Sequence, residues 1–198
     1  AVYDALHDEL FLAERGHGAR LNGAPIRVSS VASLTAATFE IGWSNRTAPE
    51  PYLKLVRSGV EAGCAVRRAG SGTLGLAYVA AGRTEAYAES HINSWDVAAG
   101  LLLVEEAGGL VGTFSGGAYA QGGNIVAASP KVYAAMLDAI KPHLVPSLQE
   151  AGNQPPPHVP RGPRDQDAHA PSIPAPSSGK GGGDHGPDPG LSRTPGLP

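Results

Sequence analysis

Apolar residues recur with two different spacings along residues 1–141, and these spacings predict both strands and helices. Alternation of apolar and polar positions, which is typical of a half-buried strand, occurs at residues 9–14 and 84–89. Asn22-Gly23, between two short apolar stretches, is a strong signal for a hairpin turn. Further strands are expected at residues 36–43, 65–69, 110–113 and 124–128.

Helical spacing of apolar residues predicts helices between these strands, at residues 51–62, 72–81, 94–107 and 129–140. The predicted helix at residues 94–107 is apolar almost all round, which indicates a buried helix. Gly82 can cap the C-terminal end of the predicted helix at residues 72–81. Because helices follow strands throughout, we expect an α/β fold. Its sheet should be mixed, with parallel and antiparallel strands and with helices on its faces.

The composition changes near residues 142–146. Residues 146–198 contain 13 of the 18 prolines and 9 of the 27 glycines, and they contain no aromatic residue. Such a segment cannot bury enough apolar surface to offset the entropy lost when a chain becomes ordered. We therefore expect a folded domain at residues 1–145 and a disordered Pro/Gly-rich tail at residues 146–198.

Composition and charge exclude several classes of protein. The 18 acidic and 15 basic residues give a net charge of −3, without the basic excess of a protein that binds nucleic acid or an anionic membrane. No apolar run reaches the roughly 18 residues of a transmembrane helix, and the first residues do not resemble a signal peptide. A single cysteine, Cys64, excludes a disulfide framework. We expect a cytoplasmic protein with no nucleic-acid or membrane partner.

Asp96 lies in the first turn of a predicted helix, within the segment that runs from Ser94 to Gly100. One interpretation is structural, because the helix dipole stabilises a carboxylate at this position. The other is functional: the side chain would enter a cleft and ligate a hard cation. Mg²⁺ takes one or two carboxylates together with substrate phosphate oxygens, so it would suit such a site. The spacing alone leaves both interpretations open.

Gly70, Ser71 and Gly72 lie where a short predicted strand turns into a helix. Backbone N–H groups at a helix start are unpaired and can face an anion or hydroxyl groups, although the glycines can also serve a tight turn alone. With Gly75, and with Glu89 further along, they match the G-x-G-x-x-G pattern of dinucleotide-binding proteins. The strand before them is too polar for a buried strand of that fold.

Glu89 ends a predicted strand shortly before the helix that carries Asp96 begins. The two carboxylates can therefore face one rim of a cleft. The alternative is that Glu89 is an ordinary solvated carboxylate at a strand end. Neither alternation nor spacing distinguishes these two interpretations.

Two nearby motifs, residues 93–100 (NSWDVAAG) and 105–109 (EEAGG), together resemble the C-terminal signature of the inositol monophosphatase family. Residues 9–11, 18–19 and 21–23 are similar to a hairpin in the middle of that family's chain. The resemblance extends over about residues 2–140 and stops at the Pro/Gly-rich segment.

The resemblance implies an Mg²⁺-dependent phosphomonoesterase of the sugar-phosphatase type, built from alternating layers of helices and sheets and forming a homodimer. Asp96 matches the family's catalytic aspartate, which ligates the metal and contacts the sugar alcohol. Glu89 matches a carboxylate that holds a substrate hydroxyl. Gly70, Ser71 and Gly72 match the loop whose backbone groups meet the inositol ring.

The chain departs from the family pattern in one respect. The family takes most of its metal ligands from an upstream Glu and from an upstream Asp-Pro-hydrophobic-Asp-Gly-Thr stretch, and that stretch is absent here. One carboxylate cannot balance two cations beside a phosphate, so the sequence resembles the C-terminal part of such a phosphatase. We therefore expect little activity from this chain by itself.

The function that the sequence favours is hydrolysis of a small polyol phosphate monoester, with inositol 1-phosphate as the preferred substrate. Phosphoadenosine phosphate, fructose bisphosphate and histidinol phosphate are alternatives within the same class. Only Arg67, Arg68 and Arg83 are expected near the site, which argues against a nucleotide. Outside that class, the alternatives are a non-catalytic remnant and a dinucleotide-binding module.

Overall fold

Two sheets and four helices make up the part of the chain that this computed structural model describes, residues 1–114 and 123–151, with side chains as far as residue 143. All of these residues lie within one of the two units into which the chain divides, Ala1–His158. No helix in the described ranges is both long and apolar enough to cross a membrane.

The elements follow one another along the chain in an alternating order. They are β1 (Val2–Asp4), β2 (Glu9–Glu14), β3 (Gly18–Leu21), β4 (Ala24–Ile26), the 3-10 turn η1 (Leu34–Ala36), β5 (Thr38–Gly42), α1 (Pro49–Glu61), β6 (Ala65–Arg67), α2 (Gly72–Ala80), β7 (Ala86–Ile92), α3 (Ser94–Glu106), β8 (Leu110–Gly112), β9 (Gly123–Ala128) and α4 (Pro130–Ala151).

The first four strands form an antiparallel sheet in the order β1-β2-β3-β4. The predicted hairpin turn is confirmed: Asn22 has φ +48° and Gly23 has φ +83°, so both turn residues adopt the left-handed conformation that the tight β3–β4 turn requires. Phe11 and Ala19 are buried on one face of this sheet, whereas Leu12 and Arg20 on the other face are exposed.

The other five strands form a mixed sheet in the order β6-β5-β7-β9-β8. Strand β5 runs parallel to β6 and β7, whereas β9 runs antiparallel to β7 and β8. The expected mixed α/β fold is therefore confirmed. Strand β7 is buried at every position except His91, because it lies in the middle of the sheet with helices on both sides.

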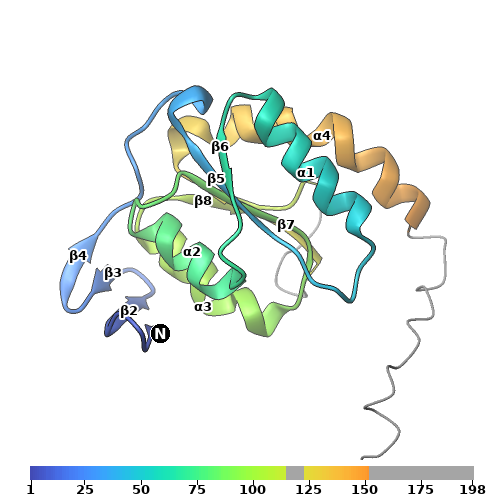
Figure 1. Ribbon diagram of the computed structural model, residues 1–198. Coiled ribbons are helices and arrows are strands. Elements are labelled where there is room, and N and C mark those ends of the chain that lie inside the picture. The colour runs from blue at the N-terminus through green and yellow to red at the C-terminus, as the bar shows by residue number, and fades with distance from the viewer. Residues whose placement is uncertain (115–122, 152–198) are drawn as a thin grey trace, which may run out of the picture. The chain divides into compact units, whose positions relative to one another are not determined.

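The helices and sheets are stacked in layers (Figure 1). Helices α2 and α3 contact both sheets and so lie between them, while α1 and α4 cover the opposite face of the mixed sheet. One core lies around α2 and α3 and contains Phe11, Leu76 and Leu103. The other lies under α1 and α4 and contains Phe39 and Met136. This arrangement confirms the expected alternation of helical and sheet layers.

Two features differ from the expectations drawn from spacing. Strand β1 was not predicted, since three residues are too short to show a period. Helix α4 continues to Ala151, beyond the expected end near residue 140, although Pro142 and Pro146 lie within it. Residues 152–198, most of the predicted tail, lie outside the described residues, so the tail stays a prediction.

The EEAGG motif has a structural explanation. Glu106, in the last turn of α3, accepts hydrogen bonds from the backbone N–H groups of Gly16 and Gly18 at 2.8 and 2.9 Å. These two bonds hold the pKa of Glu106 below its ordinary value. Gly108 follows with φ +88°, which suits the residue after a helix end. The motif therefore joins the β2–β3 turn to α3 and fixes the position of the helix.

Gly100 sets the distance between α2 and α3. A Cβ atom at this position would lie 2.6 Å from Cβ of Leu76. We expect Gly100→Ala to lower the free energy of unfolding by about 1–2 kcal/mol, because overpacking outweighs the gain in helix propensity of about 1 kcal/mol. Urea denaturation measures this change. Ala98→Ser, at an exposed position of the same helix, should change stability by less than about 0.5 kcal/mol. A Gly100→Ala protein as stable as the parent would contradict this packing.

Candidate active site

Glu89 is a buried carboxylate in the middle of the mixed sheet, on β7, with a side chain that is 5% exposed. Residues two apart on a strand share a face, so Glu89 and Tyr87 lie on the α2–α3 side of the sheet. Ala86 and Ala88 belong to the core on the other side. The interpretation of Glu89 as a solvated strand-end carboxylate is therefore wrong, since β7 continues to Ile92.

The Tyr87 hydroxyl donates a hydrogen bond to Oε2 of Glu89 at 2.6 Å. Burial raises the pKa of Glu89, and the Asp96 carboxylate raises it further, whereas the bond from Tyr87 and the charges of Arg68 and Arg46 lower it. Burial and the neighbouring Glu89 raise the pKa of Tyr87 well above its ordinary value. Tyr87 is therefore a fixed donor, and the Glu89 carboxylate has an affinity for further hydrogen-bond donors.

Glycines leave the space that this pair occupies. Gly42 lies opposite Glu89 across the β5–β7 ladder, and a Cβ there would collide with Oε2 of Glu89 and the hydroxyl of Tyr87. A Cβ at Gly72 would lie 2.7 Å from the same hydroxyl and 2.6 Å from Cδ1 of Ile92. Neither position tolerates a side chain without moving the Tyr87–Glu89 pair.

The turn at Gly70 connects the edge strand β6 to α2. Gly70 has φ +88°, which favours glycine, and Ser71 caps the helix, since its Oγ accepts a hydrogen bond from the N–H of Leu74 at 3.2 Å. The structure does not support the dinucleotide-binding alternative. Strand β5 lies between β6 and β7, whereas a dinucleotide-binding β-α-β unit joins neighbouring strands.

Asp96 lies in the first turn of α3, as expected. Its Oδ2 accepts a weak hydrogen bond from Nδ2 of Asn93 at 3.4 Å. Its backbone carbonyl accepts a hydrogen bond from Oγ1 of Thr73 at 2.8 Å, which ties the start of α3 to the start of α2. This bond brings the Gly70–Gly72 turn and Asp96 to one location.

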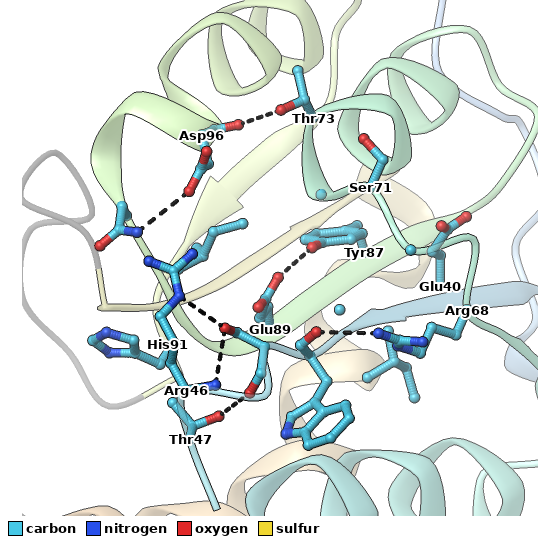
Figure 2. A pocket seen from close by; sticks show the side chains of 18 of the residues that line it. Glu40, Arg46, Thr47, Arg68, Ser71, Thr73, Tyr87, Glu89, His91 and Asp96 are labelled. Atoms are coloured by element: carbon cyan, nitrogen blue, oxygen red, sulfur yellow. Dashed lines mark hydrogen bonds between the residues drawn. The ribbon is translucent and has the colours of Figure 1, made fainter. Parts of the chain in front are cut away.

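A cavity of about 670 Å³ is lined by all five of the residues that the sequence singles out (Figure 2). These residues are Gly70, Ser71, Gly72, Glu89 and Asp96. They come from the β6–α2 turn, from β7 and from the start of α3, so the layered fold gathers segments that are separate in the sequence.

Arg68, which was expected near the site, lines the cavity. Trp43, Arg46 and Glu40 also line it, and these three were not anticipated from the sequence. Glu40 is 1% exposed; its Oε1 accepts a hydrogen bond from the N–H of Ala69 at 3.1 Å. Tyr87 also lines the cavity and was not predicted as a site residue. Its position two residues before Glu89 on an alternating strand indicates that the two side chains share a face.

The cavity does not by itself form a metal centre. Among the described residues, no three His, Cys, Asp or Glu side chains are grouped so that they could hold a metal ion. Oε2 of Glu89 is bonded to Tyr87, and Oε2 of Glu40 lies 3.2 Å from Nε of Arg67. This leaves Asp96 as the carboxylate suited to ligate a cation, which is one ligand rather than the set that a two-metal phosphatase site requires.

The family model for the inositol monophosphatase family matches residues 1–150. The chain belongs to the inositol monophosphatase family. This confirms the resemblance that residues 93–100 and 105–109 carry.

Individual relatives agree with this assignment. The Nus factor SuhB of Pseudomonas aeruginosa is 46% identical over 153 residues, which cover 75% of this chain and 56% of that protein. Inositol monophosphatase from Anabaena (Nostoc) sp. PCC 7120 has a similar structure, with a TM-score of 0.67 and 34% identity over 74% of this chain and 59% of the other. SaIMPase-II with inositol monophosphate bound also has a similar structure, with a TM-score of 0.64 and 25% identity over 76% of this chain and 58% of the other.

The chain therefore spans between half and two thirds of the length of these family members. Family membership and the layered fold are established. The Pseudomonas relative is named a Nus factor rather than a phosphatase, so the expectation that this chain has no nucleic-acid partner stays a prediction. The homodimer and the cytoplasmic location also stay predictions.

Burial of Glu89 gives stability a specific pH dependence. Because the pKa of Glu89 is raised in the folded protein, its contribution to stability is present below the ordinary glutamate pKa and is lost as the pH rises through the raised value. Glutamine stays neutral and can accept the same bond from Tyr87. We expect Glu89→Gln to be more stable than the parent at pH 7, with a smaller difference at pH 4, in urea denaturation.

Glu61→Gln is the matched control for this measurement. Glu61 is exposed, and its hydrogen bond from Arg57 lowers its pKa, so its contribution is present above the ordinary pKa and lost as the pH falls. At pH 7, Glu61→Gln should therefore lower the stability of the protein, which is the opposite of the effect expected for Glu89→Gln. A Glu89→Gln protein whose advantage over the parent shrinks between pH 4 and pH 7 would contradict the buried-carboxylate geometry.

Proposed function

We propose that this chain forms the substrate-recognition part of an Mg²⁺-dependent phosphatase that hydrolyses a small polyol phosphate monoester, with inositol 1-phosphate as the preferred substrate. The observation that carries the proposal is the buried Glu89 carboxylate, held by Tyr87 at 2.6 Å inside a cavity of about 670 Å³. Family membership supports the same class of reaction.

A polyol matches the chemistry of this carboxylate. An ionised Glu89 carboxylate can only accept hydrogen bonds, and a ring of hydroxyl groups supplies several donors. Tyr87 occupies one oxygen from one direction, which fixes the plane of the carboxylate and leaves the other oxygen for substrate. A buried acceptor of this kind disfavours analogues that lack the matching hydroxyl, because it would then be left unpaired.

The Gly70–Gly72 turn supports binding of the ring from a second side. Its glycines have no side chains, so a substrate can approach the backbone closely. The hydroxyl of Ser71 already caps α2, which leaves the backbone groups of this turn as its main contribution. Glu89 and the turn together would orient the polyol within the cavity.

Asp96 is the residue of this chain that we assign to the metal. Its position at a helix start beside the cavity suits a carboxylate that contributes one ligand to an Mg²⁺ site completed by groups outside the described residues. Bound Mg²⁺ would polarise the phosphate and lower the pKa of a water molecule. Asp96 would also contact a hydroxyl of the polyol.

The complex of SaIMPase-II with inositol monophosphate supports this choice of substrate, since that protein shares the fold. The other phosphomonoesters, phosphoadenosine phosphate among them, require features beyond a hydroxyl acceptor. A non-catalytic role for the chain by itself is favoured by one observation, namely that the described residues hold no cluster of metal ligands.

Activity of the chain alone tests the metal assignment. With a single suitable carboxylate at the site, we expect phosphate release from inositol 1-phosphate in millimolar Mg²⁺ to stay far below about 1 s⁻¹, the lower end of ordinary enzyme turnover. A colorimetric phosphate assay measures this, with Anabaena inositol monophosphatase as positive control. Turnover in the ordinary enzyme range would show that the described residues suffice for catalysis.

A chimera tests the roles of the two carboxylates. The segment of Anabaena inositol monophosphatase that this chain does not cover would be fused ahead of residue 1. In an active chimera, Asp96→Asn should lower kcat by about 100-fold or more, since losing a metal ligand should cost at least as much as losing an outer-shell partner. Glu89→Gln should chiefly raise KM, by about tenfold, as expected for weakened charged hydrogen bonds.

The matched control for the chimera is Glu61→Gln, which changes an exposed carboxylate on α1. It should leave both kinetic constants unchanged. An Asp96→Asn chimera that keeps its kcat would remove Asp96 from the metal site, and a Glu89→Gln chimera with unchanged KM would remove Glu89 from substrate recognition.

A further inference from the structure

Glu40 is a second buried carboxylate of the cavity, and the proposed function gives it no role. It lies on β5 and is 1% exposed. The parallel register of the sheet places it opposite Tyr87 on β7 and opposite Arg67 on β6. Burial of a carboxylate is unfavourable unless its oxygens have partners. The partners of Glu40 therefore indicate what this residue does.

Both oxygens of Glu40 lie against the chain just before the Gly70–Gly72 turn. Oε1 accepts a hydrogen bond from the N–H of Ala69 at 3.1 Å. Oε2 lies 3.2 Å from Nε of Arg67, which is an ion-pair distance, although it accepts no hydrogen bond within the part of the chain that the structure describes. One carboxylate thus contacts two residues of the same short segment.

This segment lies where the chain has left one element and has not yet entered the next. Backbone pairing between β5 and β6 ends at Arg67, and α2 begins only at Gly72. The N–H of Ala69 therefore has neither a strand ladder nor a helical turn to which it can donate, and a backbone N–H needs an acceptor. Glu40 supplies that acceptor, because its side chain reaches across from the neighbouring strand.

Packing against α2 confines Glu40. Phe39 and Ile41 belong to the core on the other side of the sheet, so Glu40 lies on the α2 side. A Cβ at Gly75 on α2 would lie 2.7 Å from Cδ2 of Tyr87 and 3.4 Å from Oε1 of Glu40. Tyr87 lies between Glu40 and Glu89 in Figure 2. The same face of the sheet therefore carries one carboxylate for the turn and one for the cavity.

The Gly70–Gly72 turn is held by one side chain at each end. Oγ of Ser71 accepts the N–H of Leu74 at the start of the helix, and Glu40 accepts the N–H of Ala69 before the turn. Gly70 itself has φ +88°, and glycine has wide conformational freedom. The direction in which the backbone groups of the turn point therefore depends on these two anchors.

We propose that Glu40 is a positioning residue, which holds the start of the Gly70–Gly72 turn so that its backbone groups face the polyol. Glu40 acts through Ala69 and does not itself contact the substrate. The inference rests on the proposed function, in which this turn orients the ring beside Glu89. It adds one requirement: a hydrogen-bond acceptor at position 40 sets the affinity for the polyol, and the charge of that acceptor does not.

Binding without metal tests this role. The full chain, labelled with nitrogen-15 and kept in EDTA, would be titrated with myo-inositol while NMR follows its backbone amide signals. Glu40→Met keeps a similar volume but offers Ala69 no acceptor, so its affinity should fall about tenfold, as expected for one lost hydrogen bond. Glu40→Gln keeps a side-chain oxygen for Ala69, so its affinity should stay within about twofold of the parent. The Ala69 amide should exchange faster with solvent in Glu40→Met alone.

The matched control is Glu85→Met. Glu85 is also buried in this sheet, and its Oε2 accepts a hydrogen bond from the N–H of Thr38 at 2.6 Å, but it lies outside the set of residues that line the described cavity. Its loss should lower stability and leave the myo-inositol affinity unchanged. Circular dichroism and thermal unfolding establish that each variant is folded. If Glu40→Met does not fold, Glu40→Asp, whose carboxylate is one methylene shorter, replaces it and should also weaken binding.

Three outcomes would overturn the inference while leaving the proposed function intact. They are a Glu40→Met protein that binds myo-inositol as tightly as the parent, an equal loss of affinity in Glu85→Met, and a Glu40→Gln protein as weak as Glu40→Met. Unchanged affinity in Glu89→Gln would instead overturn the proposed function alone. A parent protein that does not bind myo-inositol would overturn both.

Discussion

A single buried hydrogen bond, from the hydroxyl of Tyr87 to the carboxylate of Glu89 at 2.6 Å, is the constraint on which the site depends. A carboxylate in the middle of a sheet is unfavourable unless it is hydrogen-bonded, because burial removes its hydration. The surrounding chain is shaped to hold this pair: Gly42, Gly72 and Gly75 all lack the side chain that would collide with it. The glycines of the β6–α2 segment are thus explained by packing against β7 as well as by the turn itself.

The layered fold places this hydrogen-bonded pair in a cavity that several elements line. Because Thr73 on α2 bonds to the carbonyl of Asp96 on α3, the starts of both helices meet beside β7. The cavity then gathers the carboxylates of Asp96 and Glu89 together with Arg46 and Arg68. A hydroxyl-rich ring can donate hydrogen bonds to the Glu89 carboxylate within it. The unfavourable burial of Glu89 is the cost of that recognition.

Much of the fold followed from local patterns, because each had a direct physical cause. The Asn22-Gly23 turn needs two left-handed residues, and Gly82, with φ +68°, ends α2 as expected. The site residues were found by motif rather than by periodicity. Arg46 was missed because it lies in a segment without period or motif, and Trp43 was missed because nothing distinguishes it at the end of the strand predicted at residues 36–43. Their role arises only when β5 is placed beside β7. Gly42 was missed for the same reason, since a neighbouring strand creates the need for it.

The most direct test of the account is the titration of Glu89 itself, followed by NMR of its side-chain carboxyl carbon with and without saturating myo-inositol. Burial should place the pKa of free Glu89 above the ordinary glutamate value of about 4.3. Hydroxyl donors stabilise the charged form, so bound myo-inositol should lower that pKa. A pKa at or below the ordinary value, or one that myo-inositol leaves unchanged, would contradict a buried carboxylate that recognises a polyol.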